Sequence, residues 1–490
     1  MTFIDFVIVF VYLVATLTAG IMVRKYVGKV EHFIVAGREM NLYLGIASLA
    51  ATEFGIITCM YTAQNGYDKG FSGAAPGVLT AIAMFVVGWT GFCIKPMRDA
   101  GVMTIPELFE VRFGPRVRWL SGVVIVLGGL LNMGVFLRVG GEFLVVVCGI
   151  ELQYLVWMMT AMLILVAFYT ILGGMLSVLV TDFLQFLVMS VGMLLVTLLI
   201  LYQVGWSALV DAVTEHHGTG GFNPVTSADA GWPYVIFNGM LALAIVLTWQ
   251  TNVQRLLSSK DTKTGQRIYM GTSFFFVCRF LLPAVWGIAA LAMLTPDQQE
   301  GIKETTQLAM PMFLATAVPA GLMGILIAAM LAADMSTDAA YMLTWASVIY
   351  NDILAGWRKR RNWTDAFGIF VNRMIIACIG LFLLVFGLWY QPNIPIWDYL
   401  TVTGTIYLSS MSVLMIACCY WKGANNWGAT GAIFFGAVTP LAYLVMEKME
   451  STADFAEKIG PHYSGILTFL LVAAAMVLGS LLKPAERSAS

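Results

Sequence analysis

Long apolar runs constrain this chain more than any other feature of its sequence. A helix needs about 20 mostly apolar residues to cross the hydrocarbon core of a bilayer. Such runs recur along the 490 residues, of which 59% are hydrophobic and 11% charged. We therefore expect an all-α polytopic membrane protein with about thirteen transmembrane helices. The predicted spans are 3–23, 41–66, 74–95, 119–149, 152–172, 176–203, 233–253, 270–294, 320–352, 368–389, 396–418, 427–446 and 463–482.

Basic residues between these runs predict the orientation, because cytoplasmic loops carry the excess of Lys and Arg. The opposite side holds only Lys69, Lys303, Lys448 and Lys458. We expect the N-terminus outside, the C-terminus in the cytoplasm, and the cell (inner) membrane as the location. The cytoplasmic loops should hold Arg24, Lys25, Lys29, Arg38, Lys95, Arg98, Arg112, Arg116, Arg118, Arg255, Lys260, Lys263, Arg267, Arg358, Lys359, Arg360 and Arg361.

Composition disfavours several classes of function. A net charge of -1 gives no basic field that would attract nucleic acid. The cysteines lack the spacing of a metal site, and no serine triad, HExxH or phosphate-binding loop indicates an enzyme. The expected partners are the lipid bilayer and a small organic solute, with no obligate protein partner indicated.

Ionisable side chains inside the runs are functional candidates, because burying them in a membrane is costly. Five acids outnumber two bases, so the set favours a cation. Arg138 and Glu142 can pair as an i,i+4 couple on one helix face. The set comprises Glu53, Arg138, Glu142, Asp182, Arg279, Asp334 and Asp338.

Two short stretches near the membrane midplane predict an ion site. The first is "AATEFG" (50–55), where a broken helix would expose carbonyl groups. The second is "AADMSTDAAYML" (332–343), in which Ala333, Ser336 and Thr337 share one helical face. Neutral carbonyl and hydroxyl oxygens suit a hard ion such as Na⁺. The alternative is that these hydroxyl groups only bond back to their own helix.

Five stretches together resemble the sodium:solute symporter family. They read "VAGREMNLYLGIASLAATEFG", "TIPELFEVRFG", "GGMLSVLVTDFLQFLVM", "QTNVQRLLSSKD" and "AADMSTDAAYMLTWASVIYNDI". The resemblance implies a leucine-transporter-like fold with two inverted repeats of five helices, at 41–203 and 233–418. Residues 1–40 would supply an extra helix and the first cytoplasmic loop, and 204–232 an extracellular or periplasmic loop. Residues 419–490 would form two further helices and a short cytoplasmic tail.

The resemblance also implies a sodium site and Na⁺-coupled uptake by alternating access. The site would use the carbonyls of Ala51, Phe54 and Ala333 and the hydroxyls of Ser336 and Thr337. Relatives that bind a second sodium ion carry hydroxyl residues where this chain has Ala339 and Ala340. Because Asp182 alone remains as a possible second ligand or support, we expect one Na⁺ per cycle.

The solute is less well defined by the sequence. By resemblance, Glu53 and Thr58 should contact it from the broken helix, opposite an apolar wall of Ala242, Ile245 and Val246. An amino or cationic compound fits Glu53, whereas a carboxylate held by Arg138 stays open.

Two alternatives to sodium symport remain. Asp334 and Asp338 could carry protons in a proton-coupled permease, unless Arg138 neutralises them. The same fold could also act as a sensor without net flux.

Overall fold

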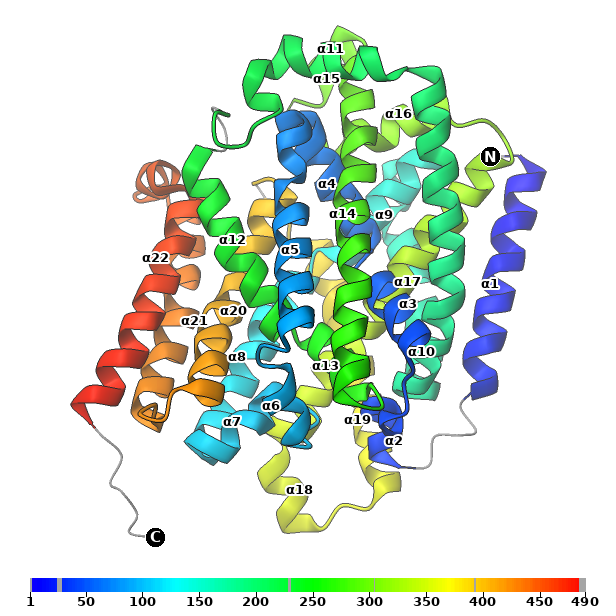
Figure 1. Ribbon diagram of the computed structural model, residues 1–490. Coiled ribbons are helices and arrows are strands. Elements are labelled where there is room, and N and C mark those ends of the chain that lie inside the picture. Colours follow the sequence, from blue (N-terminus) through cyan, green and yellow to red (C-terminus); the bar gives the residue numbers. More distant parts are fainter. Residues whose placement is uncertain (1, 24–28, 228–230, 304, 392–393, 484–490) are drawn as a thin grey trace.

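The computed structural model describes residues 2–23, 29–227, 231–303, 305–391 and 394–483. Over these residues the protein is a bundle of helices that run mostly along one direction (Figure 1). Eleven helices of the described part are long and apolar enough to cross a membrane. The predicted all-α membrane fold is therefore confirmed, whereas the predicted number of thirteen spans is not.

The α-helices of the first half are α1 (Phe3–Val23), α2 (Val30–Val35), α3 (Leu42–Thr52), α4 (Ile56–Lys69), α5 (Ala75–Thr90), α6 (Ile94–Asp99), α7 (Ile105–Phe113), α8 (Pro115–Met133), α9 (Phe136–Val147), α10 (Leu155–Gln203) and α11 (Trp206–His217). Those of the second half are α12 (Gly231–Thr248), α13 (Gln250–Ser258), α14 (Thr262–Met293), α15 (Pro296–Gly301), α16 (Ala309–Ala317), α17 (Leu322–Val348), α18 (Ala355–Arg361), α19 (Asp365–Trp389), α20 (Ile396–Tyr420), α21 (Asn426–Lys448) and α22 (Ala453–Leu482). A π-helical turn (Ile349–Ile353) continues α17.

The difference in span number arises at two places. At the first, the predicted span 41–66 is broken into α3 and α4, and α4 and α5 count together as one segment, Ile56–Thr90. At the second, two predicted spans join directly. The segment Leu152–Gln203 counts once among the eleven, although a straight helix of that length would be more than twice as long as the hydrocarbon core is thick. Gly174, with φ 54° and ψ -150°, kinks it between the predicted spans 152–172 and 176–203. A side chain there would also clash with the ring of Phe33, 2.6 Å from the position of a Cβ atom. Glycine is therefore required for both conformation and space.

Two breaks in the helices lie deep in the bundle. The predicted break is confirmed, because α3 ends at Thr52 and α4 begins at Ile56. A second break at Trp249, whose ψ is 111°, separates α12 from α13. The sequence does not predict this break, since no glycine or proline marks the position. Each break falls in the first helix of a predicted repeat, as in transporters built from inverted repeats; the repeat boundaries themselves remain predictions.

Helix α17 occupies the centre of the bundle. Within the span Leu322–Ile353, 89% of the apolar window is buried, against 22% for the span Phe3–Met22 of α1. Peripheral helices instead expose large apolar side chains, among them Phe3, Phe10 and Trp389. The hydrocarbon phase is the natural solvent for that surface. The polar residues of α17 consequently face other helices rather than lipid.

Helices α11, α15 and α16 lie at the end of the bundle where α1 begins, and α6, α7 and α18 at the end where α22 finishes (Figure 1). The basic residues of α18 therefore share an end with those of α6 and α7, as the predicted topology requires. Which end faces the cytoplasm remains a prediction. Arg24, Lys25 and the tail after Lys483 lie outside the described residues.

Two arginines assigned to cytoplasmic loops are in fact buried in helices. Arg118 lies in α8 and is 5% exposed, and Arg255 lies in α13 and is fully buried. The assignment was wrong because α8 begins earlier, and the helical segment after α12 ends later, than the apolar runs suggest. Arg118 pairs with Glu110 and Asp352, which connects α7 and α8 to the end of α17.

A glycine contact between α4 and α14 gives a test of the packing. A Cβ atom on Gly287 would lie 1.9 Å from the carbonyl oxygen of Ala63. We expect Gly287→Ala to cost about 1–3 kcal/mol or more of stability, because two helix backbones must move apart. The measurement is thermal unfolding of the detergent-purified protein. Gly239→Ala is the control, since its Cβ atom would meet nothing within 4 Å. Equal melting temperatures for both variants would contradict the packing described.

Candidate ion and substrate site

The break between α3 and α4 lies directly against the middle of α17. The Thr337 hydroxyl donates a hydrogen bond to the carbonyl oxygen of Thr52 at 2.9 Å. A Cβ atom on Gly55 would lie 2.7 Å from Thr337 Oγ1, so only glycine allows this approach. The structure thus brings together the two stretches from which the sequence predicts an ion site.

The five predicted sodium ligands are all buried at this contact. Ala51, Ala333 and Ser336 are fully buried, and Thr337 and Phe54 are 3% and 7% exposed. The Ser336 hydroxyl donates to Asp182 Oδ1 at 2.6 Å. Both hydroxyl groups therefore bond to other helices, and the alternative of bonding back to α17 is wrong. Because each hydroxyl uses its proton as a donor, its oxygen lone pairs remain available to a cation.

Asp182 of α10 is the polar centre of the region. Its Oδ2 accepts hydrogen bonds from Ser48 Oγ at 2.6 Å and Thr52 Oγ1 at 3.3 Å. Arg255 Nη2 lies 3.4 Å from the same oxygen. With Ser336, these contacts connect α10 to α3, α13 and α17. Both charged groups are fully buried, so each supplies the counter-charge that the other needs.

Arg255 is the functional candidate that sequence reasoning missed. Its guanidinium also donates to Thr52 Oγ1 at 2.6 Å and Ser48 Oγ at 3.3 Å. The unexpected break at Trp249 allows α13 to place this side chain beside Asp182. A partial signal lies in the sequence, because an acid buried in the membrane at Asp182 needs a counter-charge.

A cavity lies beside the ion site. Glu53, Thr58 and Ile245 line it, and so does Thr337. Of the other predicted solute contacts, Ala242 and Val246 are buried and do not line the cavity. Arg138 does not line it either. Seven of the twenty lining residues are aromatic, which the sequence did not predict.

Glu53 forms an ion pair with Arg279 of α14. Arg279 Nη1 lies 2.9 Å from Glu53 Oε2, and Thr251 Oγ1 donates to Oε1 at 3.2 Å. Arg279 Nη2 also donates to the hydroxyl of Tyr61 at 2.9 Å. Both carboxylate oxygens of Glu53 thus have protein partners.

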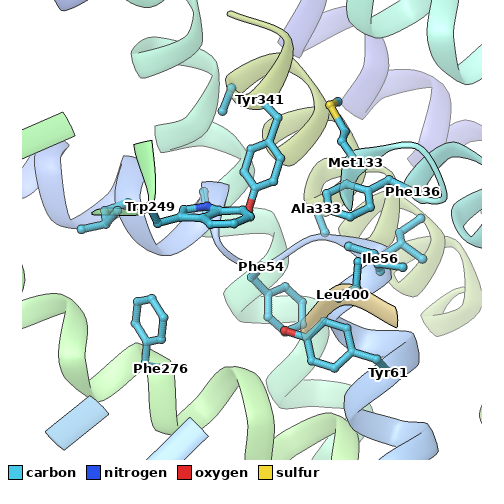
Figure 2. Close-up of a cluster of buried hydrophobic side chains, with 14 of the residues drawn as sticks. Phe54, Ile56, Tyr61, Met133, Phe136, Trp249, Phe276, Ala333, Tyr341 and Leu400 are labelled. Carbon is cyan, nitrogen blue, oxygen red and sulfur yellow. The ribbon is translucent and has the colours of Figure 1, made fainter. Parts of the chain in front are cut away.

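Aromatic rings enclose the cavity in two groups. In one group, Tyr61 contacts Trp397 and Phe280 with ring centroids 4.9 and 5.7 Å apart. In the other, the Trp249 indole N–H donates to the Tyr341 hydroxyl at 3.0 Å, a contact visible in Figure 2. These rings give the cavity a large apolar surface, beside polar side chains that include Thr58, Thr80, Asn132 and Thr401.

The remaining intramembrane charges lie apart from the cavity. Arg138 pairs with Glu142 at 2.9 Å, as the i,i+4 spacing predicted, and it also donates to the carbonyl of Gly387. Asp334 and Asp338 are 3% and 2% exposed. Asp334 Oδ2 and Asp338 Oδ1 have no hydrogen-bond partner in the part of the chain that the structure describes. The predicted neutralisation by Arg138 is thus not present in this conformation.

The comparisons with known proteins identify the family. The model of the sodium:solute symporter family matches residues 33–436. The chain belongs to that family. Sodium/glucose cotransporter 4 of Danio rerio is 26% identical to this symporter, covering 92% of this chain and 73% of its own. The high-affinity proline transporter PutP of Bacillus subtilis is 24% identical, covering 92% and 93%.

Solved structures support the fold of the symporter. A Na⁺-coupled sialic acid symporter in a substrate-bound outward-open state superposes with a TM-score of 0.82 at 20% identity, covering both chains fully. Mhp1, a nucleobase-cation-symport-1 family transporter in a closed conformation, gives 0.54 at 15% identity, covering 93% of this chain and 96% of its own. The leucine-transporter-like fold is therefore confirmed. The symporter's relatives are transporters and not enzymes.

The pairing of Asp182 with Arg255 gives a quantitative test. Arg255→Met leaves a buried carboxylate without its counter-charge, which should cost about 3–5 kcal/mol of stability. Adding Asp182→Asn should recover much of that loss, because no uncompensated charge then remains. Melting temperatures of the single and double variants in detergent measure the coupling. Arg360→Met, at an exposed position of α18, is the control. Losses that simply add would contradict the pairing.

Proposed function

We propose that this family member imports a small organic solute together with one Na⁺ per cycle by alternating access. The sodium ion is bound by the carbonyls of Ala51, Phe54 and Ala333 and the hydroxyls of Ser336 and Thr337. The observation that carries this proposal is the contact of the broken helix with Thr337 beside the central cavity. Family membership supports the coupling to sodium.

Thr337 also explains how ion and solute are coupled. It belongs to the proposed sodium site and lines the cavity. A bound Na⁺ would hold the break and α17 in one arrangement, and so fix the wall that the solute contacts. Coupling then follows because each ligand favours the conformation that the other binds.

The contacts of Asp182 support one Na⁺ per cycle. Ala339 and Ala340 provide no side-chain oxygen, and the guanidinium of Arg255 already lies against the carboxylate. A second cation at Asp182 would have to displace or repel that charge.

The sequence-based expectation of an amino or cationic solute depends on Glu53. Its ion pair with Arg279 reduces the negative charge that the cavity offers to a cation. A cationic solute is therefore favoured less by the structure than by the sequence alone.

Proton coupling is the second candidate function. The specific observation in its favour is that Asp334 and Asp338 are buried and each leaves one oxygen without a partner among the described residues. Uptake driven by a pH gradient in sodium-free buffer, and abolished by Asp334→Asn, would select it.

The sodium site predicts the behaviour of two variants. Ser336→Ala and Thr337→Ala should each raise the sodium concentration for half-maximal uptake into proteoliposomes. The loss of one ligand should cost about 1–3 kcal/mol of binding free energy, by analogy with an unsatisfied buried polar group. Ser347→Ala on the same helix is the control, since its hydroxyl donates to the carbonyl of Leu343. An unchanged sodium dependence in both variants would rule out the site.

The stoichiometry can be measured directly. The ratio of labelled Na⁺ to labelled solute taken up by proteoliposomes should be about one. A ratio of two would show that Asp182 helps to bind a second ion despite its contact with Arg255.

A further inference from the structure

The cavity has a chemical character that the ion site does not explain. Its wall includes two groups of aromatic rings. One group is Phe136, Trp249 and Tyr341, and the other is Tyr61, Phe280 and Trp397. Such rings bury apolar or aromatic groups, and the polar side chains between them can orient a bound molecule. The solute should therefore have a bulky apolar or aromatic part.

Two lining side chains have buried hydrogen-bond donors that are not used within the described residues. They are Arg279 Nε and Trp397 Nε1. The two side chains flank the same rings, because the guanidinium of Arg279 lies 5.3 Å from the centroid of Phe280 and the Trp397 ring 5.7 Å from it. Both are N–H groups that can only donate. A solute that satisfies them must present acceptor oxygens.

The charges around the cavity also favour an acidic solute. The negative charge of Glu53 is matched by Arg279. A sodium ion bound next to Thr337, which lines the cavity, would add one positive charge. In this low-dielectric setting the ion attracts an anion and repels an ammonium group. Sodium and a carboxylate would thus strengthen each other's binding.

We infer that the solute carries a carboxylate beside an aromatic or bulky apolar group, and that the N–H groups of Arg279 and Trp397 receive the carboxylate. This inference rests on the proposed sodium-coupled function. Arg279 remains paired with Glu53 through Nη1, so its Nε can bind the solute without breaking that ion pair. An α-amino group on the solute is neither required nor excluded by this arrangement.

A matched set of compounds tests the inference on the purified, detergent-solubilised protein. The probes are 3-phenylpropanoate, 3-phenylpropanamide, 3-phenylpropylamine and butanoate, each titrated in sodium and in potassium chloride while tryptophan fluorescence is recorded. We expect 3-phenylpropanoate to bind in sodium at least tenfold more tightly than its amide. The amine, which carries the opposite charge, and butanoate, which lacks the ring, should bind more weakly still.

A conservative variant separates the donor from the ring that carries it. Trp397→Phe keeps an aromatic side chain but removes the N–H group, so it should weaken binding of the carboxylate severalfold and that of the amide less, because a hydrogen bond to a charged acceptor is the stronger one. Trp389→Phe is the control, because Trp389 is 81% exposed on the outer surface of the bundle. An equal effect on carboxylate and amide would overturn the role of Trp397 as a carboxylate donor.

The same experiment distinguishes failure of this inference from failure of the proposed function. Sodium alone should raise the melting temperature of the protein, and Ser336→Ala should reduce that effect. Suppose that sodium raises the melting temperature. If the amine then binds as tightly as the carboxylate, or if 3-phenylpropanoate does not bind, the inferred substrate class is wrong and the sodium site stands. If sodium has no effect, the proposed function fails as well.

Discussion

Asp182 is a fully buried carboxylate on which the arrangement of the central helices depends. It accepts hydrogen bonds from Ser48, Thr52 and Ser336 and lies against the guanidinium of Arg255. An unpaired charge at this depth would be strongly unfavourable. Satisfying it requires α3, α10, α13 and α17 to meet at one point, and that meeting places the end of α3 against the proposed sodium face of α17.

The two helix breaks place irregular backbone next to Asp182, where the ion site is proposed. At the first break the chain leaves the helix after Thr52, whose carbonyl accepts from Thr337, while the carbonyl of Ala51 accepts from the N–H of Phe54 at 3.1 Å. The second lone pair of each carbonyl oxygen remains for a cation. At the second, Trp249 redirects the chain so that α13 can deliver Arg255 to Asp182. Irregular backbone is tolerated at this depth because protein surrounds it rather than lipid. A broken helix can also change its angle without losing the hydrogen bonds of either half, which suits alternating access.

The cavity combines an internal ion pair with an aromatic wall. Because Glu53 and Arg279 satisfy each other, the electrostatic preference of the empty cavity is weak. A sodium ion at the proposed site would then supply the nearest unmatched positive charge to a solute. Such an arrangement makes solute binding depend on the ion, which is the physical requirement for symport.

The sequence by itself determined the membrane fold, the break at "AATEFG", the family, and the face of Ser336 and Thr337. The family is indicated by the resemblance of five motifs. The other features are local, because they follow from apolar length, helical spacing and glycine. The partners of Asp182 and Glu53 were decided only by the tertiary structure, since Arg255 and Arg279 lie far from them along the chain. The break at Trp249 likewise has no local signal. Which buried charges pair depends on where helices cross, and that is set by packing over the whole bundle rather than by any single segment.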